Sequence, residues 1–85
     1  MKMKFVYFAW VKDRIGKAEE TLDVPADIGT VADLLAWMPT QGENYAAALN
    51  DPALVRVALD QEFAHADDVI GEAREIALFP PVTGG

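Results

Sequence analysis

Cysteine and serine are both absent from the 85-residue sequence, and histidine occurs only once. Without cysteine the chain can form no disulfide, offers no thiolate to a metal and has no thiol nucleophile. Without serine it has no serine nucleophile, and His65 has no second histidine at the spacing of a metal site. We therefore expect His65 to be an ordinary surface residue, and we expect that the chain is no enzyme on its own and holds no metal.

Long apolar runs are missing as well. No segment approaches the roughly 20 apolar residues of a membrane-spanning helix, and no charged-then-apolar leader opens the chain. The sequence therefore predicts a cytoplasmic protein without a membrane partner. A chain of 85 residues makes one small domain with little room for an internal active-site pocket.

Basic residues are too few and too unevenly placed for a nucleic-acid binder, which needs a dominant basic face. The net charge is −7, with five basic residues and one acid in residues 1–17 and two basic residues against thirteen acids in the remainder. The acidic bulk either aids solubility or steers the chain towards a basic partner. Asp60, Asp67 and Asp68 do not follow the spacing of a calcium-binding loop, so we interpret them as solvated loop acids.

Alternating apolar residues predict five strands. The first two are joined by a charged connection at residues 11–16, which favours a hairpin. Asp60 and Gln61 form a predicted tight turn between the third and fourth strands. The predicted strands cover residues 1–10, 17–24, 54–59, 62–64 and 73–79.

A helix is predicted directly after Thr30, an N-cap residue followed three positions later by Asp33. Its apolar stripe, at helical spacing, is Val31, Leu34, Leu35 and Met38, and Pro39 lies just beyond it. An alanine-rich segment at residues 43–49 favours a second, short helix.

These elements predict an α+β fold with a mixed sheet of about five strands, covered by one main helix plus the short one. The most economical arrangement lays the last strand beside the first, in the middle of the sheet. We therefore expect a folded domain at residues 1–79 and an extended tail at residues 80–85 that leaves the most buried strand.

The tail is stiff at its base and slim at its tip. Pro80 and Pro81 restrict φ and cannot donate to a strand ladder, so they end the strand and project the chain. At ~3.3 Å per residue, residues 80–85 reach about 20 Å. Gly84 and Gly85 have no Cβ and can thread a narrow channel. This geometry suits presentation of the terminal carboxylate inside another protein; an inert, disordered tail is the alternative.

An aromatic patch is expected at the base of the tail. The last strand directs Phe79 to the face opposite Leu78, and Phe8 and Phe63 would join Phe79 if they share its face. An exposed patch of this kind marks a protein interface. The alternative, that the rings are core residues, is equally open for Phe8.

The ending Phe79-Pro80-Pro81-Val82-Thr83-Gly84-Gly85, with Phe8-Ala9 and Gly16 earlier, resembles the small subunits of molybdopterin synthase, the MoaD family of sulfur carriers, across the whole chain. The resemblance implies a ubiquitin-like β-grasp fold and no permanently bound cofactor. It implies that an ATP-consuming adenylyltransferase, similar to ubiquitin-activating enzymes, adenylates Gly85. A sulfurtransferase then supplies sulfur and a thiocarboxylate forms.

In this family the thiocarboxylated tail inserts into the large subunit of molybdopterin synthase, within a heterotetramer. It donates its sulfur to precursor Z (cyclic pyranopterin monophosphate). Two such transfers build the dithiolene of molybdopterin. The resemblance thus implies that Gly85 carries the sulfur and that residues 80–84 thread the channel. It also implies that the partner interface is formed by Phe79, Phe63, Phe8 and Lys12.

The sequence departs from the family pattern at three places. Lys12 stands where many relatives have arginine; it keeps the charge but loses the bidentate fork. Asp60 replaces a frequent asparagine, and Gly71-Glu72-Ala73 replaces Gly-Asp-Glu. Two other hypotheses remain open: a carrier for thiazole or tRNA thiolation or a ubiquitin-like modifier joined to lysines, and a β-grasp interaction module with an inert tail. Pro-Pro-Val-Thr before Gly-Gly favours the molybdopterin carrier.

Overall fold

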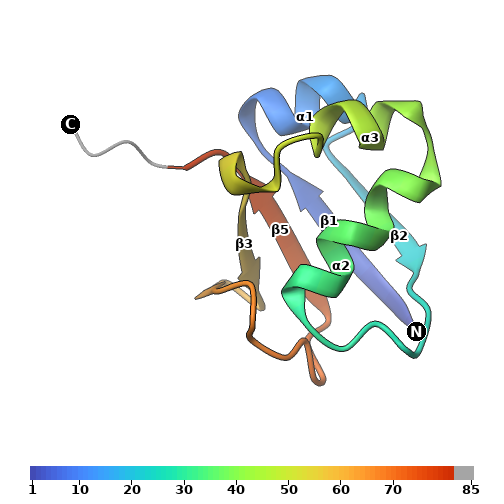
Figure 1. The fold of residues 1–85 in the computed structure, drawn as a ribbon, viewed down its shortest axis with the longest axis vertical. Coiled ribbons are helices and arrows are strands. Elements are labelled where there is room, and N and C mark those ends of the chain that lie inside the picture. The colour runs from blue at the N-terminus through green and yellow to red at the C-terminus, as the bar shows by residue number, and fades with distance from the viewer. Residues whose placement is uncertain (82–85) are drawn as a thin grey trace.

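The structure, a computed structural model, describes residues 1–81, and the predictions for Val82, Thr83, Gly84 and Gly85 lie outside this range. Five strands and three α-helices follow one another along the chain (Figure 1). In chain order they are β1 (Lys2–Tyr7), α1 (Ala9–Ile15), β2 (Glu19–Asp23), α2 (Val31–Trp37), α3 (Glu43–Ala48), β3 (Arg56–Leu59), β4 (Glu62–Ala64) and β5 (Glu75–Phe79); two 3-10 turns are η1 (Met38–Gln41) and η2 (Pro52–Leu54).

The sheet is mixed, with the strand order β2-β1-β5-β3-β4. Only the central pair β1 and β5 is parallel, with Phe5 opposite Ile76 and Tyr7 opposite Leu78. The other three neighbouring pairs are antiparallel. The predicted position of the last strand, beside the first and in the middle of the sheet, is therefore confirmed. Because β1 and β5 run in the same direction, both end at the same edge of the sheet.

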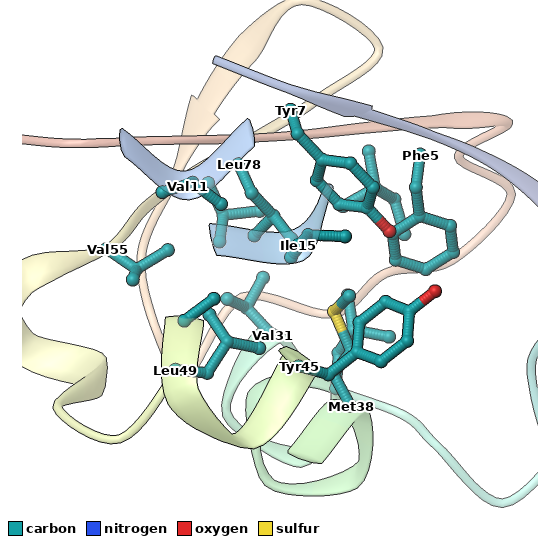
Figure 2. Packing of buried hydrophobic residues seen from close by; sticks show 14 of the residues in the cluster. Phe5, Tyr7, Val11, Ile15, Val31, Met38, Tyr45, Leu49, Val55 and Leu78 are labelled. Carbon is teal, nitrogen blue, oxygen red and sulfur yellow. The ribbon is translucent and has the colours of Figure 1, made fainter. Parts of the chain in front are cut away.

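One face of this sheet carries the core. Successive side chains of a strand point to opposite faces. On the covered face the side chains of the central strands β1 and β5 are buried, while on the open face most side chains are partly or fully exposed. Helix α2 crosses the covered face, and α1 and α3 lie side by side at one end of it (Figure 1). The core side chains drawn in Figure 2 include Phe5, Tyr7, Val11, Ile15, Val31, Met38, Tyr45, Leu49, Val55 and Leu78.

Helix α2 begins as the sequence predicts. The Asp33 N–H donates to Thr30 Oγ1, and the Thr30 N–H donates to Asp33 Oδ2, both at 3.2 Å. This reciprocal capping box satisfies two backbone donors that the first turn would otherwise leave free. Val31 and Leu34 are buried beneath the helix. The helix ends at Trp37, and the chain then tightens into the turn η1.

The prediction for residues 8–16 is wrong. The first strand ends at Tyr7, and the supposed connection is helix α1. Val11 and Ile15, four residues apart, are both buried, and the Gly16 N–H donates to the Lys12 carbonyl from a left-handed conformation with φ of 94°. Residues 8–11 are all apolar and residues 12–14 are all charged, so this short segment shows no clear periodicity that would separate a helix from a strand and a connection.

Three of the remaining strands are shorter than expected, at 19–23, 56–59 and 75–79, and the fourth covers residues 62–64 as predicted. The predicted tight turn is confirmed: Asp60 and Gln61 have φ of 49° and 72°, the left-handed conformation that two-residue hairpins use. Asp60 Oδ1 also accepts from the Arg74 and Glu75 N–H groups at 2.9 Å, and these bonds hold the pKa of Asp60 below its ordinary value. Asp60 is therefore a structural residue that ties the turn to the start of β5, and not only a solvated acid.

Candidate functional site: the base of the C-terminal tail

The base of the tail is the end of the most central strand. Phe79 is the last residue of β5, which lies between β1 and β3. Ladder hydrogen bonds continue to this point, because the Phe8 N–H still donates to the Leu78 carbonyl at 3.1 Å. Pro80 and Pro81 follow, half-buried and outside any strand, and as prolines they cannot extend the ladder as donors. The chain therefore leaves the sheet from its most firmly held strand.

The expected aromatic patch is present on the open face beside this base. We define it as Phe8, Phe63 and Phe79. The rings of Phe63 and Phe79 lie 5.7 Å apart with an interplanar angle of 46°, a separation typical of favourable aromatic pairs. Phe8 and Phe79 each follow a residue of the Tyr7–Leu78 pair, so both point away from the core. Phe8 is 50% exposed and Phe63 is 83% exposed, which overturns the alternative of core roles for these two rings.

Two basic residues flank the patch. Lys12 is exposed and lies one helical turn after Phe8, whose carbonyl accepts from the Lys12 N–H at 3.4 Å. Arg56 is exposed and is the antiparallel partner of Phe79 in the sheet. Neither side chain forms an ion pair with another residue in the range 1–81. The sequence reasoning missed Arg56, although its position between Val55 and Val57 marks it as facing outward.

A separate polar cluster closes the covered face at the far strand β2. The Tyr7 hydroxyl donates to Glu20 at 2.6 Å, and the Tyr45 hydroxyl lies 2.7 and 2.9 Å from the two Glu20 oxygens. Lys17 Nζ is the third donor and lies 3.1 Å from Glu20 Oε1. Partial burial acts to raise the pKa of Glu20, but these three donors outweigh it, and the pKa lies below its ordinary value.

Burial, and then the hydrogen bond to Glu20, raise the pKa of Tyr7 and of Tyr45. Both phenols therefore remain protonated donors over the ordinary pH range, while Glu20 remains ionised. The cluster joins β1, β2 and α3 and leaves no buried side-chain polar atom unsatisfied in the described chain. Its role is structural, and no residue of it lies in the aromatic patch.

Comparison with known proteins assigns the family. Residues 5–85 match the ThiS family. The chain belongs to the ThiS family. A relative from Escherichia coli (strain K12), named molybdopterin synthase sulfur carrier subunit, is 36% identical over 83 residues, which cover 98% of this chain and 99% of the relative. A relative of the same name from Caenorhabditis elegans is 32% identical over 87 residues, which cover 100% of this chain and 99% of the relative.

The fold of this ThiS-family chain is also similar to that of solved structures. SAMP1 from Haloferax volcanii superposes with a TM-score of 0.71 at 26% identity, and both chains are covered completely. The resemblance to molybdopterin synthase sulfur carriers and the ubiquitin-like β-grasp fold, both predicted from the sequence, are confirmed.

Neither a metal-binding cluster nor a membrane-spanning helix is present in the described residues of this ThiS-family chain. His65 is exposed, as expected for a surface histidine. No group of three or more histidine, aspartate or glutamate side chains in residues 1–81 is placed to hold a metal ion. None of the helices in this range is long and apolar enough to cross a membrane. The base of the tail and its aromatic patch remain the candidate site.

Proposed function

We propose that this chain is the sulfur carrier subunit of molybdopterin synthase and that Gly85 carries the sulfur as a thiocarboxylate. The observation that carries the proposal is the base of the tail. Pro80 and Pro81 leave the central strand beside the aromatic patch, two of whose three rings are exposed, an arrangement suited to docking while the tail enters a partner. The relatives named as sulfur carrier subunits align with nearly the whole chain, which supports the same role.

The chemistry proposed for Gly85 follows from the poor reactivity of a carboxylate. Direct substitution by sulfur would expel oxide, which is a very poor leaving group. An adenylyltransferase partner similar to ubiquitin-activating enzymes uses ATP to form a glycyl-adenylate, with release of pyrophosphate. Sulfur delivered by a sulfurtransferase at the sulfide level then attacks the acyl carbon, and AMP leaves. ATP is bound by the activating partner, so the only nucleotide carried by this chain is the transient adenylate.

The transfer step takes place on the large subunit in a cytoplasmic heterotetramer, and that subunit provides the catalytic residues. Residues 80–83 of this chain span the channel, and Gly84 gives clearance beside the reacting terminus. The aromatic patch and Lys12 contact the large subunit outside the channel. The thiocarboxylate sulfur attacks precursor Z, and water then cleaves the acyl–sulfur bond, so that the sulfur stays on the pterin and Gly85 returns as a carboxylate. Two such transfers complete the dithiolene of molybdopterin.

The first test measures the intact mass of the protein after incubation with the activating enzyme, ATP and a sulfur donor. The expected product is heavier by one sulfur-for-oxygen exchange, and fragmentation places the exchange at Gly85. Omission of ATP is the control and should leave the mass unchanged. A mass that never changes with all components present would mean that the tail is inert.

The second test separates the molybdopterin carrier from a carrier of another pathway or a protein modifier. Thiocarboxylated protein is incubated with the large synthase subunit and precursor Z, and molybdopterin is measured. Formation of molybdopterin is the expected result. Efficient thiocarboxylation without any molybdopterin, or attachment of Gly85 to lysines instead, would defeat the proposal.

A further inference from the structure

A second surface feature begins where the aromatic patch ends. A groove of about 810 Å³ lies between helix α2 and the β3–β4 hairpin. Its walls include small side chains from several elements, which leave room that larger residues would fill. The four exposed alanines among them are Ala32, Ala36, Ala53 and Ala66.

The groove reaches the base of the tail. Phe79, the residue before Pro80, lines one end of it, together with Phe63 and Arg56. Phe63 is 5.7 Å from Phe79 between ring centroids, and Arg56 is paired with Phe79 in the sheet. A protein that admits the tail as far as Pro80 therefore stands directly over this end of the groove, whatever the rest of its surface does.

The energy of a specific interface is concentrated where a side chain fills a desolvated pocket. The aromatic patch presents side chains to a partner, whereas the adjoining groove is a hollow that could take an apolar side chain from the same partner.

Charge indicates what the partner presents at the groove. Arg56 lines it, is exposed, and forms no ion pair within residues 1–81. It is also one of only two basic residues after Lys17 in a chain of net charge −7. A complementary surface would place a carboxylate opposite this arginine, because facing charges of opposite sign favour and orient a complex.

We propose that the large subunit of molybdopterin synthase seats an apolar side chain in the groove between α2 and the β3–β4 hairpin and sets a carboxylate against Arg56. This inference rests on the proposed function and adds to it a second contact region on the same partner. The activating enzyme also receives the tail, so its occupation of the groove is the alternative that the experiments below separate.

The first test places a charged side chain in the groove. Ala36→Glu should weaken binding to the large subunit about tenfold or more, because the carboxylate blocks the groove and repels the acidic partner group. Ala47→Glu is the matched control, since Ala47 is also exposed and also the penultimate residue of its helix, yet does not line the groove. It should change the Kd less than about twofold. Calorimetric titration gives the Kd, and thermal unfolding checks that both variants fold.

A second pair of variants tests the charge without altering the groove. Arg56→Gln should weaken binding about three- to tenfold and make the Kd less sensitive to salt. Arg74→Gln removes an exposed arginine that lies outside the groove and should leave both quantities unchanged. These variants keep the test decisive if Ala36→Glu does not fold.

The outcomes separate this inference from the proposed function. If wild-type protein yields molybdopterin while Ala36→Glu and Arg56→Gln bind the large subunit normally, the groove inference is wrong and the proposed function stands. If these variants lose adenylation by the activating enzyme but keep their affinity for the large subunit, the activating enzyme occupies the groove and the inference is also wrong. A wild-type protein that yields no molybdopterin defeats the proposed function itself.

Discussion

The two faces of the central strands β1 and β5 differ sharply in burial, although the residues that form them alternate along the same strands. On the covered face, Phe5, Tyr7 and Leu78 are almost completely buried under the helices. On the open face, Phe8 remains half exposed, and Phe79 joins the highly exposed Phe63. Neighbouring residues in the sequence therefore serve different ends: one holds the domain together and the next is available to a partner. The comparison implies that stability and partner binding can be changed separately.

The tail should show this separation in its strongest form. Deletion of Gly85 is expected to abolish sulfur transfer, because the remaining terminal Gly84 would stop one residue short of the reacting position. The midpoint of thermal unfolding should not change, since the buried core cluster of the described residues ends at Leu78. Mass spectrometry after the activation reaction and a molybdopterin assay measure the first effect, and circular dichroism measures the second. Loss of folding in this variant would contradict the picture of a tail that projects from a finished domain.

Leu78 and Phe79 test the two faces at adjacent positions. Leu78 is fully buried, so Leu78→Ala should lower the free energy of unfolding by about 2–5 kcal/mol through lost burial and a cavity. Urea titration measures this change. The control is Val6→Ala on the open face, where the loss should stay below about 1.5 kcal/mol because Val6 is only half-buried. Similar losses in the two variants would show that both faces contribute equally to stability.

In contrast to Leu78→Ala, Phe79→Ala should affect partner binding more than stability. We expect binding to the large synthase subunit to weaken by about 1–3 kcal/mol, the cost of removing a moderate to strong interface residue. The matched control is Thr21→Ala, an exposed open-face position on the edge strand β2, which should bind normally. Calorimetric titration compares the two variants. An unchanged affinity for Phe79→Ala would remove Phe79 from the interface.

The features that could be predicted from the sequence are those encoded by residues close together in the chain. The alternation through Leu78 and Phe79 assigns each to a face, and Thr30 with Asp33 marks the start of α2. Helix α1 is not evident from the sequence because it is short and its apolar and charged residues occur in two blocks, although Val11 and Ile15 are spaced by one helical turn.

The features that could not be predicted depend on contacts between distant parts of the chain. Nothing near Arg56 in the sequence shows that it pairs with Phe79, because that pairing requires the strand order. The meeting of Tyr7 and Tyr45 at Glu20 likewise requires α3 to bring Tyr45 to strand β2. Long-range pairing of this kind is decided by packing, and local propensity carries little information about it.

Glu20 and its neighbour Glu19 extend the comparison of the two faces to β2, with the smallest expected effect. Glu20 is only 12% exposed, and Glu20→Gln should lower the free energy of unfolding by about 1 kcal/mol at pH 7. Because folding lowers its pKa, the contribution is present above the ordinary value of 4.5 and lost as pH falls through the folded-state value. Urea titrations from pH 7 to 3 should therefore show the gap between wild type and variant closing. The control is Glu19→Gln, which loses only an exposed ion pair with Lys4 and should change stability by less than about 0.5 kcal/mol at every pH. If the difference in stability between wild type and Glu20→Gln persists below the folded-state pKa of Glu20, the two tyrosines do not stabilise its charge.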